Sequence, residues 1–88
     1  MKRIYKYPLE TTDVQTVSMP IGAKILTVQT QNEKPCIWAS VNPEAPTEKR
    51  NIEIYGTGHE IHNEADLTYI GTYQMLDGEL IFHAFERV

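Results

Sequence analysis

Residues 68–86, TYIGTYQMLDGELIFHAFE, give the clearest indication of the fold. Two runs rich in aromatic and β-branched residues flank Asp77-Gly78, and an Asp-Gly dipeptide between such runs is a strong signal for a tight hairpin turn. Apolar side chains recur with a period close to two, which is the period of a strand and not of a helix. The sequence therefore predicts a β-hairpin with strands over residues 68–76 and 79–86.

The same period recurs upstream between proline, glycine and asparagine turn signals. In the segment 23–31, the alternation places Leu26 and Val28 on one face, and a turn at residues 32–34 returns the chain as an antiparallel partner. The polar stretch 60–66 is expected to be a loop or a single helical turn. Further strands are expected over residues 3–7, 14–19, 36–41 and 51–55.

Six or seven strands at this spacing predict a mostly β fold with little or no helix, arranged as a small antiparallel sandwich or open barrel. Residues 1–88 are expected to form one β domain. A domain of this size buries only about 60–65% of the surface of its unfolded chain. The single Cys36 cannot form an intrachain disulfide and is expected to be a small buried hydrophobe rather than a nucleophile. A homo-oligomer is expected to supplement this thin core.

The charge of the chain argues against binding to a nucleic-acid polymer. The formal net charge is −4 and the eight basic residues are scattered, whereas phosphate backbones are bound by clustered Lys and Arg. No apolar stretch approaches the ~20 residues that cross a bilayer, and the amino terminus lacks the apolar region of a signal peptide. We therefore expect a cytoplasmic protein that does not bind membranes.

The densest chemical signal is YGTGH at residues 55–59, which YIGTY at residues 69–73 nearly repeats. Gly56 and Gly58 free the backbone around the hydroxyl of Thr57, and the exposed amide groups of such a loop suit an anion or a ribose. The loop is not a P-loop, because no Gly-Lys-Ser/Thr follows it. The structural alternative is a bulge or a strand-ending turn that requires positive φ.

Aromatic residues on the predicted strands offer flat surfaces on which a base stacks, worth about 1–3 kcal/mol per base. The candidates are Trp38, Tyr55, Tyr69 and Tyr73, and the alternative role of each is core packing. Arg50 opens the strand that leads to the glycine loop, where its charge would neutralise a phosphate.

The histidines suggest weaker alternatives. His59 and His62 have a His-x-x-His spacing, but a structural zinc site needs four ligands and no second pair is evident. His59 with Glu60 would serve a small hydrolase as base and orienting group. His83 lies on a predicted strand and is either a satisfied core histidine or a polar group in a pocket. No metal, cofactor or catalytic nucleophile is expected.

The chain resembles a family of short phage and prophage proteins of unknown function. The resemblance rests on an ordered set of motifs over nearly the whole chain. They are IYKY at 4–7, MPxGAKILxVQ at 19–29, Trp38-Ala39, YGTGH at 55–59, YIGTY at 69–73 and FHxFE at 82–86. The resemblance implies a small protein made by a bacteriophage inside its host. Such proteins are similar in outline to the phage sponges that sequester nucleotide immune signals, an analogy of size and setting.

The leading hypothesis is a non-enzymatic, β-rich homo-oligomer that binds and sequesters a small nucleotide-derived ligand as an anti-defence sponge. One alternative is a small hydrolase or phosphodiesterase acting on such a ligand. Another is a protein-binding inhibitor or a structural phage protein whose aromatic residues form an interface. The expected ligand-binding residues are Trp38, Arg50, Tyr55, Gly56, Thr57, Gly58, His59, Tyr69, Thr72 and Tyr73.

Overall fold

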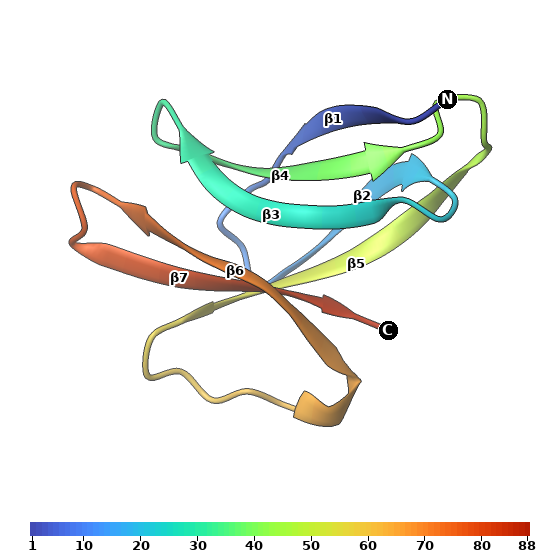
Figure 1. The fold of residues 1–88 in the computed structure, drawn as a ribbon. Coiled ribbons are helices and arrows are strands. Elements are labelled where there is room, and N and C mark those ends of the chain that lie inside the picture. The colour runs from blue at the N-terminus through green and yellow to red at the C-terminus, as the bar shows by residue number, and fades with distance from the viewer.

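Seven strands and one short 3-10 turn make up the computed structural model, which describes residues 1–88 (Figure 1). This arrangement confirms the mostly β prediction. The structure contains no helix long and apolar enough to span a bilayer. The elements are β1 (Arg3–Pro8), β2 (Val14–Pro20), β3 (Lys24–Gln31), β4 (Lys34–Val41), β5 (Thr47–Gly56), η1 (Glu64–Asp66), β6 (Leu67–Met75) and β7 (Leu80–Arg87).

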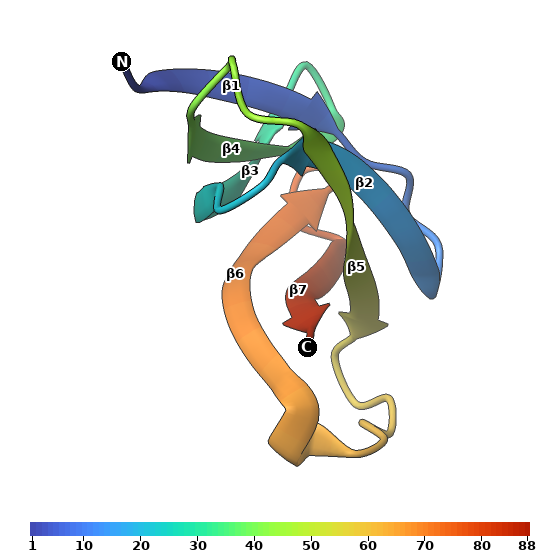
Figure 2. The same ribbon diagram turned by 90° about the vertical axis from the view of Figure 1, so that its right-hand side faces the viewer.

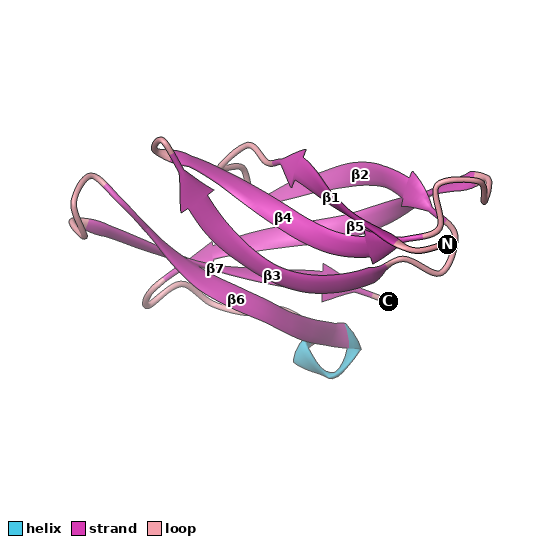
Figure 3. Ribbon diagram, turned by 45° about the horizontal axis from the view of Figure 1, so that its top comes forward, coloured by secondary structure: helices cyan, strands magenta, loops and turns pink.

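The strands form two antiparallel sheets that share one core (Figure 3). The strand order is β1-β4-β3 in the three-stranded sheet and β2-β5-β7-β6 in the four-stranded sheet. Side chains from both sheets meet between the layers, so each sheet has one inner and one outer face. The two sheets do not close into a complete barrel. The predicted small antiparallel sandwich or open barrel is confirmed.

Both predicted hairpins are present. In the β3–β4 hairpin, Asn32 and Glu33 both have positive φ, of 52° and 64°. Two such residues form the loop that matches the natural twist of the flanking strands, and β4 consequently begins at Lys34. In the β6–β7 hairpin, the positive φ of Leu76 ends β6 one residue earlier than predicted, and Asp77 shares that conformation.

Two β-bulges change which residues face the core. In β3 the register shifts between Ile25 and Thr27, so Leu26 is an extra residue on that strand. Leu26 is 43% exposed and Val28 is 2% exposed, so the prediction that these two residues share a face is wrong. In β6 a second bulge lies between Tyr69 and Gly71. Each bulge reverses the alternation of the residues beyond it.

The core is built from the inner faces of both sheets. Cys36 is 2% exposed and has a free thiol, which confirms its predicted role as a small buried residue. The side chains of Leu9 and Met19 are also fully buried, so the segment that leads from β1 into β2 is anchored in the core. The core cluster consists of Leu9, Met19, Ala23, Val28, Ile37, Ala39, Val41, Ile52, Ile54, Tyr73 and Ala84.

The two sheets approach each other most closely where β3 meets β6. A Cβ atom added to Gly71 would lie 2.9 Å from Cγ1 of Val28 and 3.6 Å from the backbone nitrogen of the same residue. The first distance is shorter than a normal carbon contact, and the branched valine has little freedom to move away. Gly71 is therefore required by this close approach.

Replacing Gly71 with alanine should destabilise the fold by about 1–3 kcal/mol, because the extra methyl overpacks the β3–β6 contact. Urea unfolding followed by circular dichroism measures this change. In the double variant Gly71→Ala/Val28→Ala, the missing Cγ1 should relieve the clash. The two substitutions should therefore cost less together than the sum of their separate effects. Simple additivity would contradict the proposed contact.

Candidate functional site

The outer face of the four-stranded sheet brings the two glycine-threonine segments together. Tyr55 on β5 and Thr72 on β6 are both register partners of His83 on β7, the strand between them. The hydroxyl of Thr57 lies 2.8 Å from Nε2 of His83, and the hydroxyl of Thr72 lies 2.9 Å from Nδ1. One histidine therefore joins the two segments through both of its ring nitrogens.

The hydrogen-bonded chain continues beyond His83. The hydroxyl of Tyr69 lies 2.6 Å from the hydroxyl of Thr72, which gives a continuous order from Thr57 through His83 and Thr72 to Tyr69. In a neutral imidazole one nitrogen donates and the other accepts, so the two threonine hydroxyls take opposite roles toward the ring. This series of hydrogen bonds thereby fixes the orientation of the hydroxyl groups of Thr57, Thr72 and Tyr69 at the protein surface.

Aromatic rings lie beside the hydrogen-bonded series from Thr57 to Tyr69. Phe85 makes edge contacts with Tyr55 and Tyr69, at centroid distances of 5.8 Å and 5.5 Å. Tyr69 is 58% exposed, so its ring remains accessible. A cavity of about 270 Å³ opens between β5, β7 and the loop after β5. We define the outer-face site as Tyr55, Thr57, Tyr69, Thr72, His83 and Phe85.

The glycine loop at the end of β5 is a tight turn. The backbone amide of His59 donates to the carbonyl of Gly56 at 3.1 Å, and Gly58 has a φ of 91°. The imidazole of His59 folds back over Gly56, whose amide donates to Nδ1 at 3.3 Å. A Cβ at Gly56 would lie 2.8 Å from Cε1 of that ring. The strand-ending turn accounts for Gly58, whereas the ring near Gly56 belongs to an exposed side chain that can rotate away and does not by itself require glycine there.

The backbone amides of this loop are largely occupied. The amide of Gly56 donates to the ring of His59, the amide of Thr57 donates to the carbonyl of Ile81 at 3.4 Å, and the amide of His59 closes the turn. Only the amide of Gly58 has no internal partner among these four positions. The loop thus contributes the hydroxyl of Thr57 and the imidazole of His59, and it does not form the amide cradle expected from the sequence.

Tyr73 was expected at the site but lies in the core. It is 3% exposed, its ring packs against Phe82, and its hydroxyl lies 3.2 Å from the hydroxyl of Thr11. Burial raises the pKa of the Tyr73 phenol, and the hydrogen bond to Thr11 opposes that rise. The bulge after Tyr69 reverses the alternation and turns Tyr73 inward, so its ring does not belong to the outer-face site.

Trp38 and Arg50 also lie apart from the outer-face site. Trp38 alternates with fully buried neighbours on β4, so it lies on the outer face of the other sheet, where the ammonium of Lys6 is 6.0 Å from its ring centroid. The guanidinium of Arg50 forms two hydrogen bonds with Glu86 and donates to the carbonyl of Ala23 at 2.9 Å. The hydrogen bond to Glu86 raises the pKa of Arg50.

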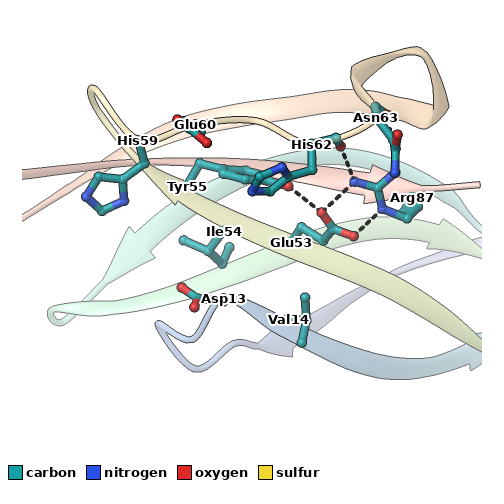
Figure 4. A pocket seen from close by; sticks show the side chains of 10 residues that line it. All are labelled: Asp13, Val14, Glu53, Ile54, Tyr55, His59, Glu60, His62, Asn63 and Arg87. Carbon is teal, nitrogen blue, oxygen red and sulfur yellow. Dashed lines mark hydrogen bonds and ion pairs between the residues drawn. The ribbon is translucent and has the colours of Figure 1, made fainter.

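The ion pair between Glu53 and Arg87 was not predicted from the sequence (Figure 4). Arg87 donates two hydrogen bonds to the carboxylate, of which the Nη2–Oε1 bond measures 2.9 Å, and the hydroxyl of Tyr55 donates to Oε1 at 2.6 Å. Glu53 is consequently only 8% exposed although it lies on an outer face. The one sequence signal for a buried charge was the position of Glu53 between Ile52 and Ile54 on a predicted strand.

Arg87 also holds the loop after β5 against the sheet. Its Nη2 donates to the carbonyl of His62 at 2.7 Å, and its Nη1 donates to the carbonyl of Asn63 at 3.2 Å. The hydrogen bonds from Arg87 lower the pKa of Glu53, and the bond to Glu53 in turn raises the pKa of Tyr55. The charged pair therefore fixes both the Tyr55 ring and the adjacent loop.

A cavity of about 460 Å³ lies over this ion pair, between the start of β2 and the loop. Figure 4 shows the side chains of His59 and His62 on the loop side of β5. No three His, Cys, Asp or Glu side chains in the structure are close enough to hold a metal ion together. The lining residues are Asp13, Val14, Glu53, Ile54, Tyr55, His59, Glu60, His62, Asn63 and Arg87.

The fold and the outer-face site define a small, two-sheet β domain that presents an ordered aromatic and hydroxyl surface on its four-stranded sheet. The chain belongs, over residues 1–88, to the family described as "Domain of unknown function (DUF7352)". No curated protein and no solved structure matches the chain.

Replacing Glu53 with glutamine should lower the melting temperature at neutral pH by about 4–8 °C. A loss of about 1 kcal/mol in the free energy of unfolding produces a shift of this size in a domain of this length. The folded-state pKa of Glu53 lies below its ordinary value of 4.5. The ionised group therefore stabilises the fold above that value, and this contribution is lost as the pH falls through the lowered pKa. Melting curves from pH 7 to pH 3 should show a weaker acid dependence in the variant.

The exposed Glu60→Gln provides the matched control and should leave both the melting temperature and its acid dependence nearly unchanged. Equal effects of the Glu53 and Glu60 substitutions would contradict the role assigned to the ion pair.

Proposed function

We propose that this protein binds and sequesters a small nucleotide-derived ligand through the outer-face site and does not alter it chemically. The observation that best supports this proposal is the convergence of the two glycine-threonine segments on His83. Beside the chain of hydroxyls, aromatic rings offer a surface for a base, a contact worth about 1–3 kcal/mol. Hydroxyl groups that the imidazole of His83 holds at fixed positions suit the hydroxyls of a ribose.

The site favours the base and sugar of the ligand over its phosphates. Three of the four amides in the glycine loop already have partners within the protein. The guanidinium of Arg87 is neutralised by Glu53, and the nearby loop contains Glu60. The chain as a whole carries a formal net charge of −4. A phosphate would gain little here, so the ligand should direct its phosphates toward solvent.

The arrangement of His83 favours holding a ligand over transforming it. Both ring nitrogens are hydrogen-bonded to threonine hydroxyls, at 2.8 Å and 2.9 Å. A general base must be free to take a proton from the substrate, and a histidine held on both sides acts instead as a positioning group. His59 is engaged at one nitrogen only: its Nδ1 accepts the amide of Gly56, which places the proton of a neutral ring on Nε2, where it donates rather than accepts. The hydrolase is therefore the second candidate.

The biological setting that we propose follows from the sequence motifs. A phage protein in the cytoplasm of a bacterial host would remove a nucleotide signal by binding it, and tight binding alone would suffice. A homo-oligomer would increase the number of sites per particle. This setting rests on the resemblance to short phage proteins and on the analogy with sponges of similar size.

Incubation with ADP-ribose, NAD or a cyclic dinucleotide, followed by gel filtration and heat denaturation, should release one of these compounds intact. Mass spectrometry of the supernatant distinguishes the alternatives. An altered nucleotide would instead support the small hydrolase. Retention of none of the three by the folded protein would contradict the proposal in favour of a protein-binding or structural role.

Thr57→Val and Thr72→Val should each weaken binding of the retained nucleotide by about tenfold, since each removes one hydroxyl, worth about 1 kcal/mol or slightly more. Valine keeps the shape and the strand preference of threonine, so the fold should persist. Thr47→Val, at the far end of β5, is the matched control and should bind normally. Isothermal titration calorimetry measures all three, and equal affinities would place the site elsewhere.

A further inference from the structure

One edge of the four-stranded sheet is strand β2, whose outward backbone groups pair with no other strand. Figure 2 shows β2 along the outer edge of the molecule, with β5 on its inner side. Its sequence, VQTVSMP, contains no charged residue, and its register with β5 runs without a bulge. A regular, uncharged edge is a template for pairing with another strand.

The other three sheet edges are protected against such pairing. Strand β1 contains Arg3 and Lys6, and charges on an edge strand block edge association. Strands β3 and β6 lie against each other through the Gly71–Val28 contact, and each contains a bulge. Strand β2 is therefore the one edge that is both regular and unprotected.

The hydrogen bonds to β5 show which groups of β2 point outward. At one end the carbonyl of Asp13 accepts from Ile54 at 3.0 Å, and at the other end the amide of Ile21 donates to Pro46 at 2.8 Å. Antiparallel ladders alternate along the strand, so the odd-numbered residues between these points bond to β5. The remaining backbone groups point to the free edge, and they belong to Val14, Thr16 and Ser18.

We propose that a second copy of the chain pairs with this edge, β2 against β2 in antiparallel register, about a two-fold axis at Thr16. Thr16 then pairs with its counterpart, and Val14 of each copy pairs with Ser18 of the other. Each of these three pairs exchanges two N–H···O bonds. A two-fold axis makes the edge complementary to itself, as an isologous dimer requires.

The side chains along the edge permit this register. Val14, Thr16 and Ser18 are exposed and uncharged, so no like charges meet across the interface. Thr12 donates its hydroxyl to the carbonyl of Val14, which retains a second lone pair for the partner strand. Pro20 has no amide hydrogen, so the ladder ends before that residue.

The pairing also brings a second copy beside the cavity of about 460 Å³ over the Glu53–Arg87 pair. Asp13 and Val14 form the rim of this cavity on the β2 side. In the dimer, Ser18 of the second copy lies opposite Val14 and extends the sheet beside that rim. The four strands of each copy then form one continuous eight-stranded sheet with both outer-face sites on it. The pairing does not depend on the proposed ligand.

Sedimentation equilibrium should show a particle of twice the 10.1 kDa chain mass that dissociates on dilution. The interface is confined to one strand, so it belongs with small interfaces of under roughly 1,200 Å² and weak association. Measurements from ~1 µM to ~1 mM cover the range of such affinities. A wild-type protein that stays monomeric throughout this range would overturn the proposal.

A charge swap tests the register itself. The double variant Val14→Lys/Ser18→Lys places like charges opposite each other and should shift dissociation to at least tenfold higher concentration. The variant Val14→Lys/Ser18→Glu places opposite charges at the same positions and should restore the dimer. Both variants should fold, as circular dichroism will check, because these side chains are exposed. Equal association of the two variants would rule out the antiparallel pairing.

Amide hydrogen exchange gives an independent readout at the edge. In the wild-type protein, the amides of Thr16 and Ser18 should exchange more slowly as the concentration rises, while the amide of Lys6 on the protected edge should not change. A dimer whose β2 amides exchange at the monomer rate would contradict pairing through this edge.

Discussion

The bulge at Ile70 in β6 is the constraint on which both the core and the outer-face site depend. Without the extra residue, Tyr69 and Tyr73 would share a face, as strict alternation requires. With it, Tyr69 and Thr72 face outward, while Gly71 and Tyr73 face the core. Gly71 therefore makes the close contact between β3 and β6, while Tyr69 and Thr72 place their hydroxyl groups beside β7.

The central position of β7 explains why His83 connects segments far apart in the sequence. Strands β5 and β6 flank β7, so Thr57 and Thr72 reach the same imidazole from opposite sides. Further along β7, Arg87 binds Glu53 and the backbone of the loop after β5. These contacts offset the entropy cost of ordering the loop in the folded protein itself. The proposed ligand would therefore meet a surface that is already ordered.

Local sequence signals were sufficient for most of the fold. The Asp77-Gly78 turn and the period of two located both strands of the last hairpin, and the polar stretch 60–66 contains only a short 3-10 turn. The bulges were not predicted, because an extra residue leaves no composition signal and is fixed by packing between sheets. The face assigned to Leu26 was wrong for this reason.

The candidate site was only partly accessible from sequence. The motif residues Thr57 and Thr72 both contact His83, because β5 and β6 flank β7. Trp38 lies elsewhere because strand order within a sheet is set by long-range pairing that the local pattern does not encode. Arg50 lies on β5 five residues before Tyr55, so strand alternation places it on the opposite face, with the buried Ile52 and Ile54. The Glu53–Arg87 pair joins residues 34 positions apart and has no local signature beyond a charge in an apolar strand.

Binding at the outer-face site is tested most directly by titrating the isotope-labelled protein with ADP-ribose, NAD and a cyclic dinucleotide. The readout is the set of amide and imidazole chemical shifts. One of these compounds should shift the signals of Thr57, Thr72 and His83. The indole signal of Trp38, on the opposite face, should not move. Shifts centred on Trp38, or no shifts with any of the three compounds, would contradict binding at the outer-face site.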